Sequence, residues 1–171
     1  MGGTFAAPDR EEPEMPDYSN DAKTLLARVD RHGWQATHVF DPDGAEPDFT
    51  YTVGLADRLK APEIIVFGLS KSLMHSMLAE VQRQIAEEGL AVADGQHITG
   101  LLGGFDCIAR RAIHPELFTE FAVSALWYWR DRGHAGRPEV MQIAWPSATT
   151  GLFPWDPGCA QSVIDDQPPL W

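Results

Sequence analysis

The sequence of 171 residues predicts a single α+β domain with a mainly antiparallel sheet of about five or six strands and three helices. Two short segments, residues 49–55 and 62–69, each read as a strand that ends in Gly-Leu. In the first, apolar side chains alternate with threonines, which predicts one apolar and one hydroxyl-bearing face. The second is apolar from Ile64 to Phe67, as in a strand covered on both faces. Three further segments carry apolar residues at helical spacing and predict the helices.

The N-terminal part of the chain is expected to form a tail, one helix and a hairpin. Residues 1–18 are rich in Pro, Glu and Gly, lack a period, and predict a disordered acidic tail. A helix follows from about residue 19 to the stop signal at Gly33. Residues 34–40 form the next strand, and the turn signal at residues 41–44 joins it to the strand pair through an acidic loop.

The C-terminal part mixes helices and strands in the same way. The expected elements are a helix from the cap Ser70 to Gly89, short strands and loops at 90–103, a strand at 105–113, a helix from Pro115 to about Trp129, and a last strand at 139–145. The aromatic segment 151–158 is expected to pack over the edge of the sheet. The domain therefore extends over residues 19–158, and residues 159–171 are predicted to be a flexible tail.

The formal net charge of −12 is concentrated near the two ends of the chain. Residues 1–21 hold six acids and one base, residues 156–171 hold three acids and no base, and residues 22–155 have a net charge of only −4. A nucleic-acid-binding face needs clustered Lys and Arg, so the charge distribution argues against nucleic acid as a partner.

Other features of the sequence indicate the compartment. No run of about 18 apolar residues predicts a membrane-spanning helix, so no membrane partner is expected. The first residues show no basic region followed by an apolar core, as a secretory signal would. Cys107 and Cys159 lack metal or redox spacing. Together these features predict a cytoplasmic protein with reduced thiols.

Seven residues are candidates for a ligand pocket or a protein interface. The hydroxyl face of the first strand of the pair, with neighbouring aromatic side chains, is suited to lining a small pocket. Glu63 stands out because it begins an otherwise apolar strand, although a solvated carboxylate at the strand end is the leading interpretation. Tyr and Trp suit a ligand wall or an interface, and an ordinary core equally well. The candidates are Thr50, Tyr51, Thr52, Glu63, Gln142, Trp145 and Trp155.

No catalytic residue, metal site or cofactor is predicted. The six histidines contain no i, i+4 pair, so the spacing typical of a zinc site is missing. Cys107 falls in an expected strand, where a buried structural thiol is favoured over a reactive one. The glycine-rich stretch from Gly100 to Gly104 lacks the Lys-Ser/Thr of a phosphate-binding loop, and a plain turn is expected there.

Four ordered motifs resemble the bacterial family called domain of unknown function 4262. They are Tyr51-Thr-Val-Gly-Leu55, Pro62-Glu63 leading to Gly68-Leu69, Gln142-Ile-Ala-Trp-Pro146 and Gly151-Leu-Phe-Pro-Trp155, and the resemblance covers about residues 20–158. In that family a His usually precedes the Pro-Glu pair and an Asp usually follows the Trp-Pro pair. Ala61 and Ser147 stand at those two places here, so the resemblance implies that a catalytic role of either group would be lost in this chain.

Three functions stay open, and the sequence favours binding over catalysis. The first is a non-catalytic module that binds a protein or a small molecule, with the aromatic C-terminal segment and the hairpin as contacts. The second is a small enzyme or a flavin- or nucleotide-binding protein with a cleft beside Thr50–Thr52, by loose analogy to small flavin-binding split barrels. The third is an immunity- or antitoxin-like protein whose acidity matches a basic partner.

Overall fold

The fold is seen in a computed structural model that describes residues 19–171. The predicted N-terminal tail, residues 1–18, lies outside the described residues. Six strands form one mixed sheet in the order β1-β2-β3-β6-β5-β4. The strands are β1 (Gln35–Val39), β2 (Phe49–Val53), β3 (Glu63–Phe67), β4 (His97–Leu102), β5 (Phe105–Arg111) and β6 (Val140–Ala144).

Only the central pair of the sheet, β3 and β6, is parallel, and every other neighbouring pair is antiparallel. The predicted strand pair is β2 and β3, in which Tyr51 lies opposite Ile65. All residues of β3 and β6 are buried, as expected for strands covered on both faces. The predicted α+β class, with a mainly antiparallel sheet of five or six strands, is confirmed.

The three predicted helices are found, and the third is divided in two. The helices are α1 (Ser19–His32), α2 (Leu55–Leu59), α3 (Lys71–Glu88), η1 (Leu117–Phe121), α4 (Val123–Asp131) and α5 (Gln161–Asp165). The helix predicted from Pro115 is interrupted at Ala122, whose ψ of 48° is not helical. Helices α2 and α5 have five residues each and are too short to show a helical period in the sequence.

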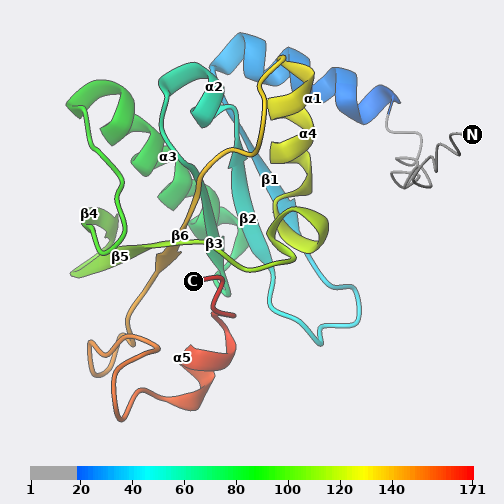
Figure 1. The fold of residues 1–171 in the computed structure, drawn as a ribbon. Coiled ribbons are helices and arrows are strands. Elements are labelled where there is room, and N and C mark those ends of the chain that lie inside the picture. The colour runs from blue at the N-terminus through cyan, green and yellow to red at the C-terminus, as the bar shows by residue number, and fades with distance from the viewer. Residues whose placement is uncertain (1–18) are drawn as a thin grey trace, which may run out of the picture.

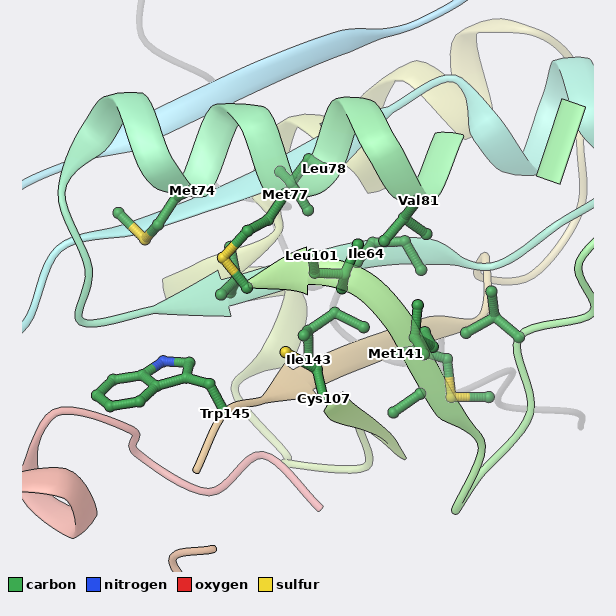
Figure 2. Close-up of a cluster of buried hydrophobic side chains, with 14 of the residues drawn as sticks. Ile64, Met74, Met77, Leu78, Val81, Leu101, Cys107, Met141, Ile143 and Trp145 are labelled. Carbon is green, nitrogen blue, oxygen red and sulfur yellow. The ribbon is translucent and has the colours of Figure 1, made fainter. Parts of the chain in front are cut away.

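Helices cover both faces of the sheet. Helix α3 lies against one face, and α1, η1 and α4 lie against the other (Figure 1). The α3 side chains point onto β3, β4, β5 and β6 and form a closed apolar cluster (Figure 2). The residues contributed by α3 are Met74, Met77, Leu78 and Val81. None of the helices between residues 19 and 171 has the length and apolar character that a membrane crossing requires.

The C-terminal segment differs from the prediction of a flexible tail over residues 159–171. It forms α5 and then returns to the sheet, where Leu170 is only 1% exposed in the core beneath η1 and α4. The amide of Gln142 on β6 donates to the Pro168 carbonyl and accepts from the Leu170 N–H, each at 2.9 Å. The segment is held by one buried leucine, Leu170, and by the amide of Gln142. Neither leaves a periodic pattern in the sequence, and for this reason the segment was predicted to be flexible.

Gly68, at the end of β3, is a position that only glycine fits. Its φ is +77°, and an added Cβ would overlap the backbone oxygen of Asp166. The chain turns at this glycine, and another stretch of backbone comes close to it. This contact places the C-terminal segment against the end of β3.

Candidate functional site

Glu63 is buried rather than solvated, so the leading interpretation of it as a strand-end carboxylate in water is wrong. The residue is 2% exposed, and its carboxylate accepts four hydrogen bonds. The Thr52 hydroxyl donates at 2.6 Å, and the other donors are the backbone amides at the start of α2, residues 54–56, at 2.9–3.3 Å. Because α2 leaves these amides without helical partners, the carboxylate completes the N-terminus of that helix.

The environment of Glu63 changes its acidity. Burial raises its pKa from 4.5 to about 7, while the hydrogen bonds from Thr52 and the three amides oppose this rise because they favour the ionised form. All four acceptor positions of the carboxylate are occupied from within the chain. Thr52 and Glu63, which the sequence proposed for a pocket, are therefore brought together as a buried structural pair.

Tyr51, Gln142 and Trp145 also hold parts of the fold together. The Tyr51 hydroxyl accepts the Ser124 N–H at 3.2 Å and so ties β2 to α4. Trp145 Nε1 donates to the Phe67 carbonyl at 2.8 Å, and the backbone of Trp145 pairs with the side-chain amide of Gln167. The polar groups of these three residues are therefore hydrogen-bonded within the protein.

Trp155 is the one exposed residue among the seven candidates, at 38%. It stacks on Phe153 at 5.0 Å between ring centroids and meets Trp171 edge-on at 5.4 Å. The Arg110 guanidinium lies 4.7 Å from the Trp155 ring centroid. The aromatic segment thus packs on β5 through Arg110.

Thr50 is the only one of the seven candidates that lines a pocket among the described cavities. The pocket, here called the Thr50 pocket, has a volume of about 620 Å³ and lies between α3 and the strands β1 and β2. Thr50 accepts or donates a hydrogen bond of 2.8 Å with His38 Nδ1, which orients that imidazole. The lining residues are Ala36, His38, Thr50, Lys71, Ser72, His75 and Ser76.

The chemistry of the Thr50 pocket suits an anion. Its lining contains a lysine, two histidines and three hydroxyl groups, and no acidic residue. Lys71 and Ser72 belong to the first turn of α3, so the positive end of an 18-residue helix lies at the pocket. No ion pair within residues 19–171 involves Lys71, whereas His38 Nε2 lies 3.7 Å from Asp48 Oδ2.

Sequence reasoning missed His38, Lys71 and His75 as a group. Residues 38 and 71 lie on elements that are not neighbours in the sequence, so only the fold brings them together. One sequence signal was present at Lys71. A lysine in the first turn of a helix opposes the helix dipole, and α3 carries no acidic residue in that turn to offset it.

A second depression, here called the hairpin groove, lies beneath the β1–β2 loop and has a volume of about 470 Å³. Four of its lining residues are acidic and none is basic. Phe40, which is 63% exposed, and Phe121 give it an aromatic surface. The acidic residues are Asp41, Glu46, Glu116 and Glu120.

Two other groups of reactive side chains have structural partners. His134 Nε2 lies 2.6 Å from Asp57 Oδ1, and the Tyr128 hydroxyl donates to Asp57 Oδ2 at 3.0 Å. Burial alone would raise the pKa of Asp57, but the hydrogen bonds from His134 and Tyr128 lower it overall.

Cys107 is fully buried, and this burial together with Asp106 raises the pKa of its thiol to about 12. Between residues 19 and 171 no three His, Cys, Asp or Glu side chains gather to hold a metal ion.

Ser147, which stands where the family resemblance implies Asp, is buried and organises a turn. Its hydroxyl accepts the N–H groups of Thr149 and Thr150 at 3.3 and 3.4 Å. An Asp side chain makes the same kind of turn, so the substitution keeps this local role. Ala61 lies in the short loop between α2 and β3 and is partly buried.

Comparison with known proteins places the chain in a family. No curated protein and no solved structure matches it. The family model described as a domain of unknown function (DUF4262) matches residues 28–160, which include all six strands, the end of α1 and the segment around Trp155. The chain therefore belongs to the DUF4262 family.

Proposed function

We propose that this protein is a non-catalytic binding module that takes a small anionic molecule in the Thr50 pocket. The observation that carries the proposal is the charge of the lining: Lys71, His38 and His75 surround a volume of about 620 Å³ that no acidic residue lines. Carboxylate and phosphate groups are the anions that such donors recognise. The pocket is lined on the sheet side by Ala36, His38 and Thr50.

The hydrogen-bond donors of the pocket come from two rigid elements. Helix α3 presents Lys71 and Ser72, and its position is fixed by the buried cluster with the sheet. Strand β1 presents His38, which Thr50 orients. A preformed set of donors binds an anion without the cost of ordering flexible groups.

A binding role fits the contacts of the other titratable groups better than catalysis does. The buried carboxylate of Glu63 has four partners within the chain, and the Cys107 thiol is not ionised at neutral pH. Neither group lines the Thr50 pocket. The free thiols of Cys107 and Cys159 support a cytoplasmic location as part of the proposal.

The proposal is tested by a thermal-shift screen of the full chain with inorganic phosphate, dicarboxylates and nucleoside monophosphates. A ligand at 100 times its dissociation constant stabilises the folded state by about 2.7 kcal/mol and raises the melting temperature. We expect at least one anion to do so.

Matched variants locate the binding. Lys71→Met removes the pocket lysine, and Lys23→Met removes the same charge from the exposed face of α1, outside the pocket. The first is expected to weaken anion binding tenfold or more and the second to leave it unchanged. Equal effects of the two variants, or no stabilisation by any anion, would contradict the proposal.

A second candidate function follows from the hairpin groove. Its four acidic residues and exposed Phe40 favour a basic segment of a partner protein, whose lysine or arginine stems pack on aromatic rings while the charged heads meet carboxylates. An oligolysine peptide is the probe. The double variant Glu116→Gln/Glu120→Gln should weaken its binding, whereas Asp106→Asn/Asp131→Asn, which removes two exposed acids elsewhere, should not. If both double variants weaken binding equally, the peptide responds to the net charge of the protein, and this result would contradict binding in the hairpin groove.

A further inference from the structure

The two edge strands of the sheet, β4 and β1, differ in how they are protected. On β4 the carbonyl of Thr99 accepts the side-chain amide of Gln84 at 2.8 Å. Gly100 has a φ of +80°, and the pairing of β4 with β5 is irregular between Ile98 and Leu102. An irregular edge whose carbonyl is already occupied is a poor template for a further strand.

Strand β1 has none of this protection. Residues Gln35–Val39 include no proline, lysine, arginine or acidic residue, and their pairing with β2 is regular throughout. Within residues 19–171, no hydrogen bond other than the ladder with β2 reaches the backbone of β1. All five residues of β1 are partly exposed, whereas all of β2 is buried. Such an edge is open to pairing with another strand.

The strand register identifies the backbone groups of β1 that point away from the sheet. The Gly68 N–H donates to the Asp48 carbonyl at 2.8 Å, in continuation of the β2–β3 register. Because the bonding direction alternates along a strand, even-numbered residues of β2 bond to β3 and odd-numbered ones to β1. Odd-numbered residues of β1 lie opposite odd-numbered residues of β2. The N–H and C=O groups of Ala36 and His38 therefore point outward.

We propose that the edge of β1 is an interface for a second copy of this chain, whose own β1 pairs with it in antiparallel orientation and continues the sheet across a two-fold axis. Ala36 of each copy pairs with His38 of the other, and each pair exchanges both N–H···O bonds. Thr37 then lies at the axis opposite its own counterpart, and pairs of facing threonines stabilise a sheet. The same patch serves both copies, as a two-fold interface requires.

The aromatic residues that flank β1 fit this register. Continued beyond the strand, it sets Phe40 of one copy opposite Trp34 of the other. Both rings lie on the α3 side of the sheet, since Trp34 stacks on His75 of α3 at 6.0 Å and Phe40 stacks on His38 at 6.4 Å between centroids. Phe40 is 63% exposed in the single chain. A cross-strand aromatic pair would cover it.

Opposite charges meet at both ends of the paired strands, which favours a second copy over an unrelated strand. Arg31 lies in the last turn of α1, just before β1, and is exposed. It forms no ion pair within residues 19–171. The loop after β1 holds the exposed acids Asp43 and Glu46. In an antiparallel pair this loop of one copy lies at the Arg31 end of the other.

Analytical ultracentrifugation of the full chain tests the association. The mass should rise from that of one chain toward twice 18.9 kDa as the concentration increases from about 1 μM to about 1 mM, because a small interface gives a weak, reversible dimer. A mass of one chain over the whole range would overturn the proposal. Growth beyond the dimer would also overturn it, since a two-fold interface is closed.

Matched variants assign the dimer to β1. Thr37→Lys places like charges directly opposite each other at the axis and should weaken dimerisation about fivefold. Thr99→Lys adds the same charge at an exposed position of the other edge strand, so it should leave the dissociation constant unchanged. Equal effects of the two variants would show a response to net charge and would contradict pairing through β1.

Cross-linking keeps the test decisive if Thr37→Lys does not fold. In the proposed register the two copies of residue 37 form a pair without backbone hydrogen bonds, in which the side chains lie close together. Cys159→Ser first removes the partly exposed native thiol. In that background, Thr37→Cys treated with oxidised glutathione should give a covalent dimer, whereas Thr99→Cys should not. A covalent dimer from neither variant, or from both alike, would overturn the proposed pairing.

Discussion

At the scale of single residues, Glu63 makes the stability of the fold depend on pH. Its pKa is about 7 in the folded protein and close to 4.5 in the unfolded chain. A raised pKa in the folded state means that the folded state binds the proton more tightly than the unfolded state does. The stabilisation is therefore complete below pH 4.5 and is lost as the pH rises through 7.

The prediction concerns the free energy of unfolding, compared between the wild type and the variant Glu63→Gln. The glutamine side chain of the variant does not titrate. The gap between pKa values of 4.5 and about 7 corresponds to about 3 kcal/mol. The free energy of unfolding of the wild type, relative to that of the variant, should fall by about this amount between pH 4.5 and pH 8. Urea unfolding of both proteins across this range measures it. A difference that does not change with pH would show that Glu63 titrates alike in both states.

Gly68 gives a second residue-scale prediction. Gly68→Ala places a methyl group against the backbone of Asp166, whereas Gly44→Ala, at a similar positive φ, meets nothing within 4 Å. Both variants lose about 1–2 kcal/mol from the left-handed backbone. Gly68→Ala should lose about 1–3 kcal/mol more through overpacking. Thermal or urea unfolding compares the two, and equal losses would mean that the C-terminal segment moves aside.

How far the sequence predicts single residues depends on whether their partners are local. The alternation of Thr50 and Thr52 with apolar neighbours correctly predicted two chemically different faces of β2. The burial of Glu63 was missed because its donors become available only when α2 turns over the end of β2. His38 and Lys71 likewise become neighbours only through the packing of α3 on the sheet.

At the scale of elements, the segment after α5 is an integral part of the core. Leu170→Ala is expected to lower the free energy of unfolding by about 2–5 kcal/mol, because a buried leucine leaves a cavity. Leu152→Ala, at a half-buried leucine of the preceding loop, is the control and should cost clearly less. Urea unfolding measures both. Similar small losses would show that the segment contributes little to the core.

Element prediction from the sequence succeeded where a period extends over enough residues. The stripe of α3 and its Ser70 cap were correctly predicted, and Ser70 Oγ accepts the Leu73 N–H at 3.3 Å. The helices α2 and α5 were not predicted, since five residues span little more than one turn. The path of residues 166–171 depends on the paired amide of Gln142, and a single glutamine in a strand is no signal for such a contact.

At the scale of the whole molecule, stability should increase from the edges of the sheet to its centre. Strands β3 and β6 are buried on both faces and have neighbours on both sides, whereas β1 and β4 are edge strands. We expect amide hydrogens of β3 and β6 to exchange most slowly, at rates set by global unfolding, and those of β1 to exchange by local opening. Hydrogen-exchange NMR tests this order. Protection of β1 equal to that of β3 would indicate that another element covers the edge.

The parallel pairing of β3 with β6 also affects how the protein is made. A ribosome completes β3 at residue 67 and reaches the first residue of β6 only at residue 140, which takes roughly 4–15 s at ordinary elongation rates. During this interval the apolar segment Ile64–Phe67 has an unpaired edge of the kind that attaches to other chains. Nascent chains of this protein therefore pass through a period of vulnerability to aggregation, and slower translation between these two strands lengthens it.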